Sequence, residues 1–168
     1  MFKVGDTVIH PAEGVCEIID IAEKSFGGKT DEYYVLKSVY DGQSTVYIPV
    51  ESVRANSKIR PALDKGQVEL IIDSLEDKEP LSTENDNQRR LLFKDIMVSG
   101  NPDDMGQMLK TVHLLKNSIR ASGKKIKVSD ERIIKETERS VFAEFAFSLG
   151  ISPDEIPSYM ESRLGSSV

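Results

Sequence analysis

The sequence lacks the residues and the apolar runs that several protein classes need. It has one cysteine, Cys16, so no internal disulfide can form, and its place in a strand pattern predicts a small buried residue. Tryptophan is absent and aromatic residues make up 7% of the chain, which argues against a single large core. No apolar stretch approaches the roughly 20 residues of a membrane span. The start, MFKVGDTV, has no apolar core of a secretory signal. We therefore expect a cytoplasmic protein without a membrane segment.

Catalytic and metal-binding patterns are also scarce. The two histidines, His10 and His113, lie far apart in the chain and have no Cys or His partners at zinc-ligand spacing. The run SFGGKTDE contains Gly27 and Gly28, but it lacks the first glycine of a phosphate-binding loop and opens no helix, so it predicts a hairpin turn. No GxSxG nucleophile motif occurs. We predict that the protein is not an enzyme and uses neither cofactor nor metal.

Residues 1–53 carry the pattern of short β-strands. The segments DTVIH, GVCEIIDIA, EYYVLKSV and STVYIPV are rich in Val, Ile, Tyr and Thr, which suit a pleated sheet. The segments HPAEG, FGGKTD and YDGQS between them contain the Pro and Gly residues of tight turns. Several short strands joined by tight turns predict a meander that curls into a small barrel.

From residue 61 onward the apolar residues recur at helical spacing. Pro61 is expected at the start of the first helix, within PALDKGQVELIIDSL. Capping residues predict the later helix ends. The expected boundaries are an end at Gly100, a helix from Asn101 and Pro102 to Gly123, a helix from Ser129 to Gly150, and a capping box of Ser152 with Glu155.

Strands and helices are segregated along the chain, which favours separate domains over one mixed sheet. The predicted fold class is α+β with two domains, a small N-terminal β barrel or meander followed by a compact all-α domain. We predict a β domain over residues 1–60, a helix and an acidic linker over 61–86, and a helical domain over 87–168.

The net charge of −6 hides an uneven distribution. Residues 76–86 hold five acids against one lysine, and residues 136–168 hold six acids against two arginines. Residues 87–135 hold eleven Lys and Arg against five acids. A basic segment between acidic flanks suits phosphate contacts, although solvated surface charge is the plainer alternative. No base-reading motif occurs, so DNA binding would depend strongly on salt.

The basic residues of this segment lie on a helix start, on a helix end and in the connection after it. The candidate phosphate contacts are Arg89, Arg90, Lys94, Arg120, Lys124, Lys125 and Lys127. The β domain is too small and too acidic for the same task. Small barrels with an open edge strand often bind another protein by strand addition. A protein-binding β domain joined to a phosphate-binding helical domain predicts an adaptor.

The segments FKVGDTVIHPAEGVCEIIDI, EYYVLK and STVYIPVESV closely resemble the amino-terminal module of the CarD/CdnL bacterial transcription regulators, which also occurs in transcription-repair coupling factors. The positions that carry this resemblance are Gly5, Asp6, Val8, His10, Pro11, Gly14, Val15, Tyr33, Leu36, Val46, Ile48 and Pro49. Downstream, RRLLFKDIMVSGN and the following helices resemble the family's helical domain. The helicase part of a coupling factor is absent, so the resemblance is to the stand-alone regulator.

The resemblance implies a transcription regulator that binds bacterial RNA polymerase. Its Tudor-like β domain would pair a sheet edge with a strand of the polymerase β subunit. Its helical domain would contact promoter DNA near the upstream edge of the bubble and so modulate open-complex stability. The implied state is a monomer without a membrane partner. A protein-interaction adaptor without significant DNA binding is the alternative, and an enzyme with an unrecognised site is the third possibility.

Site residues carry over by position. Lys24 matches a basic position that grips the polymerase in relatives, whereas Tyr47 stands where relatives have a second basic residue. The implied polymerase-binding residues are Lys24, Tyr33, Thr45, Val46, Tyr47, Ile48 and Pro49. Well-known members place a Trp wedge before the paired arginines, and this chain has Asn87 there, which joins the basic residues as a DNA contact. Because Asn lacks an apolar face, we expect weaker bubble stabilisation or reliance on the basic contacts alone.

Overall fold

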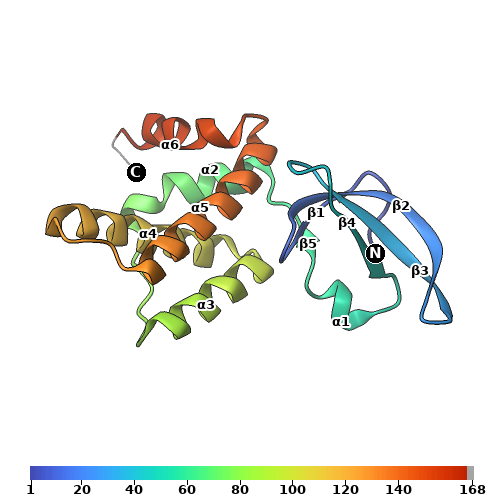
Figure 1. The fold of residues 1–168 in the computed structure, drawn as a ribbon. Coiled ribbons are helices and arrows are strands. Elements are labelled where there is room, and N and C mark those ends of the chain that lie inside the picture. The colour runs from blue at the N-terminus through green and yellow to red at the C-terminus, as the bar shows by residue number, and fades with distance from the viewer. Residues whose placement is uncertain (166–168) are drawn as a thin grey trace. The chain divides into compact units, whose positions relative to one another are not determined.

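The structure is a computed structural model that describes residues 1–165, and it divides into two compact units, residues 1–62 and residues from 63 onward. The first unit is a five-stranded antiparallel sheet and the second is helical (Figure 1). The predicted fold class is therefore confirmed. A helix and an acidic linker were expected over residues 61–86, and of these residues 63–86 group with the helical unit. No helix among residues 1–165 is both long and apolar enough to cross a membrane.

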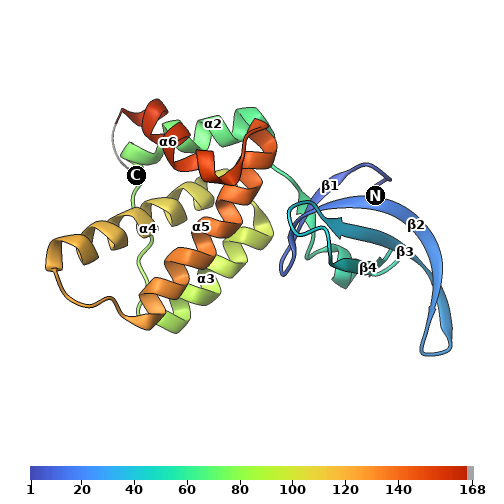
Figure 2. The same ribbon diagram turned by 45° about the horizontal axis from the view of Figure 1, so that its top comes forward.

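The sheet of the first unit has the strand order β4-β3-β2-β1-β5. Its strands are β1 (Thr7–His10), β2 (Gly14–Phe26), β3 (Lys29–Ser38), β4 (Thr45–Pro49) and β5 (Arg60–Pro61), with the short helix α1 (Val53–Asn56) between the last two. β2 and β3 form a long, curved hairpin (Figure 2). Its turn is Gly27 and Gly28, both at positive φ, so the hairpin prediction for SFGGKTDE is confirmed.

The core of the β unit lies on one face of this curved sheet. Val8, Ile18, Tyr34 and Leu36 are almost fully buried there, and Cys16 is buried as predicted. The segment GVCEIIDIA alternates imperfectly because a β-bulge between Ile18 and Asp20 shifts the register. A bulge inserts one residue, so the residues beyond it change faces.

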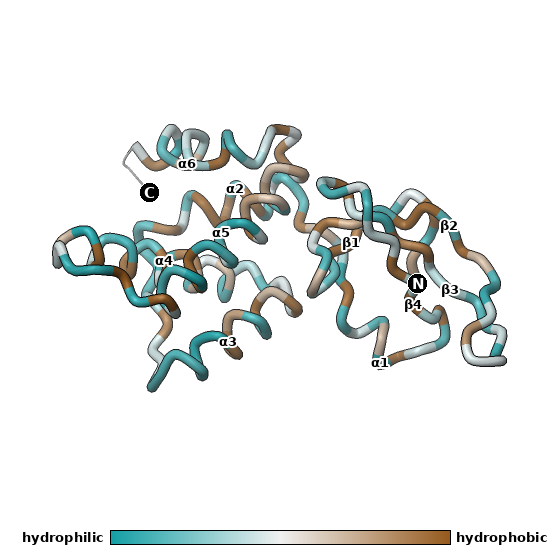
Figure 3. The backbone as a smooth tube through the Cα atoms, in the orientation of Figure 1, coloured by the Kyte–Doolittle hydropathy of each residue, from teal (hydrophilic) through white to brown (hydrophobic). Residues whose placement is uncertain are grey.

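The helical unit contains five α-helices and two short 3₁₀ helices within the described residues. They are α2 (Lys65–Asp73), η1 (Leu75–Asp77), α3 (Asp86–Ser99), α4 (Pro102–Ser122), α5 (Val128–Leu149), η2 (Pro153–Glu155) and α6 (Ile156–Leu164). Hydrophilic and hydrophobic residues alternate along these helices (Figure 3), as expected for helices that bury one face. Met105, Met108 and Phe145 are fully buried in the shared core.

Most predicted helix ends are confirmed by their caps. Asn101 accepts a hydrogen bond from the backbone N–H of Asp104, and Gly100, Gly123 and Gly150 end helices in the left-handed conformation. The capping box of Ser152 with Glu155 is also present, on η2.

Two predicted helix starts are wrong. α5 begins at Val128, one residue before the expected Ser129. Pro61 does not start a helix. It lies in β5 opposite Val8, on an edge strand where a missing N–H is tolerated, and Asp64 caps α2 through a capping box with Gln67.

The acidic stretch after η1 is fixed to α4. The backbone N–H of Leu81 donates to Thr111 Oγ1 at 2.8 Å, and Leu81 packs against the helical core. Lys78 Nζ bonds Asp103 at 2.8 Å, and the lysine stem runs over Gly106, where a Cβ atom would lie 3.1 Å from it. This stretch therefore belongs to the packed helical unit.

Candidate functional site

The first candidate surface is the outer edge of β4, which is one of the two edge strands of the sheet. The backbone N–H of Val50 donates to the backbone oxygen of Glu32 at 3.0 Å. This bond fixes which residues of β4 direct their backbone groups toward β3. In an antiparallel pair every second residue directs its backbone groups away from the partner strand. For β4 these residues are Thr45 and Tyr47. Such an edge is a template for adding a strand from another protein.

The far end of β4 is closed by α1. The side-chain amide of Asn56 donates to the backbone oxygens of Pro49 at 2.8 Å and Ser52 at 2.7 Å. The side chain of Ile48 is buried in the core, and that of Val46 is half-buried against it. Of the predicted β4 contacts, only Thr45 and Tyr47 are therefore exposed.

An aromatic cluster of Phe26, Tyr33 and Tyr47 lies on the sheet face opposite the core. Ring centroids are 5.1 Å apart for Phe26 and Tyr33, and 5.5 Å apart for Phe26 and Tyr47. Phe26 is 49% exposed and Tyr47 is 39% exposed. Lys24 Nζ lies 5.9 Å from the centroid of the Tyr47 ring. The structure thus brings together three predicted polymerase contacts, Lys24, Tyr33 and Tyr47, on a patch of the kind that marks protein interfaces.

Phe26 belongs to this cluster and was missed by the sequence reasoning. The sequence feature that could have identified Phe26 is the hairpin turn at Gly27 and Gly28. Counting back from that turn pairs Phe26 with Lys29 and Lys24 with Asp31, which places Phe26 and Lys24 on the same face because they are two residues apart.

His10 has a structural role at the turn between β1 and β2. Its Nδ1 accepts hydrogen bonds from the backbone N–H groups of Ala12 and Glu13, both at 3.1 Å. Burial lowers the pKa of His10, while the Glu13 carboxylate acts in the opposite direction. The neutral imidazole is therefore the form that holds the turn. No cluster of three or more His, Cys, Asp or Glu side chains suited to a metal ion occurs in residues 1–165.

The second candidate surface begins on α3. Asn87, Arg90, Leu91 and Lys94 are all exposed and follow the spacing i, i+3, i+4, i+7, so they form one stripe along the helix. Arg90 Nη2 donates to Asn87 Oδ1 at 3.0 Å, which holds the guanidinium at the helix start. Leu91 is 46% exposed and interrupts the polar stripe. We call these four residues the α3 stripe.

Arg89 points away from the α3 stripe into the helical unit. Its Nη2 lies 2.8 Å from Asp130 and 3.4 Å from Asp86, and its side chain is only 12% exposed. Ser129 Oγ donates to Asp86 at 2.9 Å beside it. The structure therefore gives Arg89 an internal bonding role that fixes the start of α3 to the start of α5.

This attachment brings separated basic residues to one end of the helical unit. Lys127 directly precedes α5, whose first turn is bonded to α3, and the two helix starts lie side by side (Figure 2). Lys124 and Lys125 lie exposed in the connection before it, and Arg120 is exposed in the last turn of α4. Exposed cations thus lie on α3, in the connection before α5 and, farther from the two helix starts, at the end of α4, and we call this region the helix junction.

Comparison with known proteins finds both a matching family and a similar protein. Residues 2–63 match the CarD-like/TRCF RID domain family. Over 159 residues the chain is 23% identical to "Putative transcription factor YdeB" of Bacillus subtilis (strain 168), and the alignment covers 95% of this chain and 99% of that protein. The family match coincides with the β unit, and the second match extends through the helical unit. The β unit is therefore similar to the CarD-like/TRCF RID domain, and the chain as a whole is similar to a protein named as a putative transcription factor.

Proposed function

We propose that this protein is a transcription regulator that docks on the β subunit of RNA polymerase and contacts promoter DNA, and thereby modulates open-complex stability. The match of the β unit to the CarD-like/TRCF RID domain family, and the similarity of the whole chain to a putative transcription factor, support a transcription-related role that involves RNA polymerase. The observation that carries the proposal is that the matched domain combines an open edge strand, β4, with the exposed aromatic cluster beside it.

In this proposal a strand of the polymerase β subunit pairs with the backbone of Thr45 and Tyr47. The rings of the aromatic cluster supply contact area, and Lys24 supplies a positive charge next to them. Tyr47 replaces a basic residue of relatives, so this contact depends on area and a hydroxyl group. Val46, Ile48 and Pro49 shape the strand from its core side and its closed end.

Two substitutions at Tyr47 separate ring contacts from backbone pairing. Tyr47→Thr removes the ring but keeps the N–H and a residue suited to strands. Tyr47→Pro also removes the outward N–H, which the sheet itself does not use. We expect affinity of the full-length protein for purified bacterial RNA polymerase to fall about tenfold or more for Thr, as at an interface hot spot, and further for Pro. Val4→Thr, another exposed apolar position of the β unit, is the control. Equal binding by all three variants would refute docking through β4.

We further propose that the helix junction contacts DNA. Arg90, Lys94, Arg120, Lys124, Lys125 and Lys127 would bind phosphates, and Asn87 would reach the minor groove. Leu91 would supply the apolar contact to an unstacked base step that Asn87 lacks. Arg89, predicted as a phosphate contact, would support the surface from inside by fixing α3 to α5.

Fluorescence anisotropy with a labelled promoter duplex at several salt concentrations tests this contact. We expect affinity to fall steeply with salt, and Arg90→Ala to reduce the slope of log K against log salt by about 1, as the loss of one phosphate contact predicts. Arg139→Ala, which removes an exposed arginine outside the basic segment, should leave the slope unchanged.

The alternative is an adaptor that binds polymerase without significant DNA binding. The observation in its favour is the burial of Arg89 between two aspartates, which removes one arginine from the basic surface. Retained polymerase binding together with undetectable duplex binding at low salt would establish the adaptor.

A further inference from the structure

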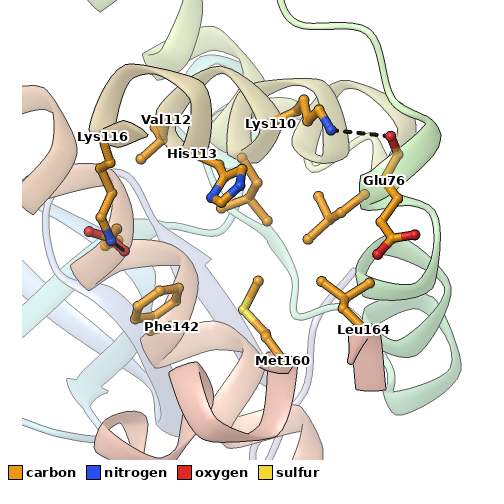
Figure 4. Close-up of a pocket in the computed structure, with 11 residues that line it drawn as sticks. Glu76, Lys110, Val112, His113, Lys116, Phe142, Met160 and Leu164 are labelled. Atoms are coloured by element: carbon orange, nitrogen blue, oxygen red, sulfur yellow. Dashed lines mark hydrogen bonds and ion pairs between the residues drawn. The ribbon is translucent and has the colours of Figure 1, made fainter. Parts of the chain in front are cut away.

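A pocket in the helical unit takes no part in either proposed contact surface. It is a cavity of about 60 Å³ lined by residues of η1, α4, α5 and α6 (Figure 4). Leu75, Val112, Phe142 and Met160 contribute an apolar floor. Charged and polar residues line the rest, among them His113, Lys110 and Lys116 from α4. An apolar cavity with a few converging polar groups is the usual form of a small-molecule site.

The pocket contains a buried hydrogen-bond donor without an acceptor. The side-chain nitrogen Nδ2 of Asn117 lies 3.2 Å from His113 Nε2 and can only donate, so the ring proton resides on Nδ1. Nδ1 is buried and has no hydrogen-bond partner among the residues that the structure describes. Leaving such a donor unsatisfied is unfavourable, because it loses its hydrogen bonds to water on burial. Nδ1 is closed to water as the ring stands, so a ligand oxygen satisfies this donor only when the imidazole turns toward the pocket.

The surroundings of His113 favour a negative charge. Burial is the largest cause that lowers the pKa of His113, and the nearby cations Lys110, Lys116 and Arg120 lower it further. The Lys116 ammonium is already paired with Glu138 at 3.1 Å. Lys110 Nζ instead donates to the backbone oxygen of Glu76 at 3.1 Å, a bond that leaves its positive charge uncompensated. The side-chain carboxylate of Glu76 lies on the Leu164 side of the pocket, across from His113 (Figure 4).

We propose that this pocket binds a small branched-chain carboxylate. Its carboxylate oxygens accept hydrogen bonds from Lys110 Nζ and, once the imidazole turns toward the pocket, from His113 Nδ1–H, and its short apolar body contacts Phe142 and Met160. The cavity volume limits the buried part to a few carbon atoms, since one water molecule already occupies about 30 Å³ of liquid. The inference is independent of the proposed transcription function, because none of the pocket residues belongs to the aromatic cluster or the helix junction.

Nuclear magnetic resonance titration of the full-length protein with 3-methylbutanoate tests the proposal. We expect saturable shifts of backbone amides around His113 and Phe142. The matched alcohol 3-methylbutan-1-ol and the matched cation 3-methylbutylammonium should bind at least tenfold more weakly, because they lack the carboxylate. Acetate should also bind at least tenfold more weakly, because it lacks the branched body. Equal binding of the carboxylate and the alcohol, or the absence of saturable shifts, would overturn the proposal.

Substitutions of the pocket residues test which side chains contact the ligand. Lys110→Met and His113→Leu should each reduce affinity for 3-methylbutanoate at least fivefold, and His113→Gln should restore part of the loss because its amide keeps an N–H donor. Lys135→Met removes an exposed lysine outside the pocket and should bind as the wild type does. If His113→Leu does not fold, the Lys110→Met variant and the comparison with the alcohol still test whether the pocket binds the carboxylate. Unchanged affinity of Lys110→Met would contradict the assigned head-group contact.

Discussion

The two units of this protein offer partners different chemistry. The β unit presents backbone groups along β4 and the aromatic cluster next to them. The helical unit uses Arg89, whose side chain is only 12% exposed, to join helices, and leaves other cations exposed. A strand edge is recognised through its backbone groups, so the proposed pairing at β4 does not require a charged side chain at position 47. A phosphate surface recognises charge, so its residues are less exchangeable.

The largest expected effect concerns Glu144, which is fully buried in α5 and accepts a hydrogen bond from the backbone N–H of Leu63 at 2.9 Å. Glu144→Ala leaves that N–H buried and unsatisfied and opens a cavity. We expect the helical unit to lose about 3 kcal/mol of unfolding free energy while the β unit is unchanged. Glu144→Gln keeps an acceptor and should lose less.

Urea unfolding followed by two signals separates the units. Helical circular dichroism reports mainly on the helical unit, and tyrosine fluorescence reports mainly on the β unit, because four of the five tyrosines lie there. A parallel shift of both transitions would show that the two units unfold as one.

The next effect distinguishes an internal Arg89 from a DNA contact. Asp130→Asn removes the closest carboxylate partner of Arg89 and should cost about 2 kcal/mol, since the guanidinium stays largely buried. If Arg89 positions α3 against α5, DNA affinity should fall several-fold in anisotropy measurements. An increase in DNA affinity would instead mean that the released arginine binds phosphate directly.

A smaller effect on folding, but a direct one on promoter opening, is expected at Leu91. Because this side chain is 46% exposed, Leu91→Ala should change stability by no more than about 0.5 kcal/mol. Open-complex lifetime, measured after competitor challenge, should shorten several-fold if Leu91 contacts an unstacked step. Asn87→Trp, which places an apolar wedge on α3, should lengthen it. An unchanged lifetime in both variants would exclude wedge contacts by α3.

The smallest effect is the pH dependence of the β1–β2 turn. The pKa of His10 is lowered from its usual 6.5 in the folded protein, so folding favours the neutral ring. Its contribution to stability is fully present above pH 6.5 and is lost as pH falls through the lowered folded value. Amide exchange of Ala12 and Glu13 should therefore accelerate at pH 5 relative to pH 7.5 after correction for intrinsic rates. His10→Asn should remove that difference, and its persistence would exclude His10 as the cause.

Local patterns predicted the elements well where the cause is local. Asn101, Pro102 and Gly123 bound a helix because capping involves residues close in sequence. Pro61 was misplaced because proline suits both a helix start and an edge strand, and pairing with Val8 decided between them. The acidic stretch looked like a linker because composition does not show that Leu81 packs on a helical core.

The sequence by itself determined the two-domain α+β fold, the family resemblance of the β unit and the basic segment. It did so because strand and helix periods, turn residues and charge are properties of neighbouring residues. The tertiary structure alone decided which of those residues remain available to a partner. Pairing across the hairpin added Phe26 to the aromatic cluster, and an ion pair across forty-one residues turned Arg89 inward toward Asp130. The inward turn of Arg89 depends on a contact between residues distant in sequence, which no local pattern encodes, whereas the place of Phe26 follows from the hairpin turn once the strands are paired.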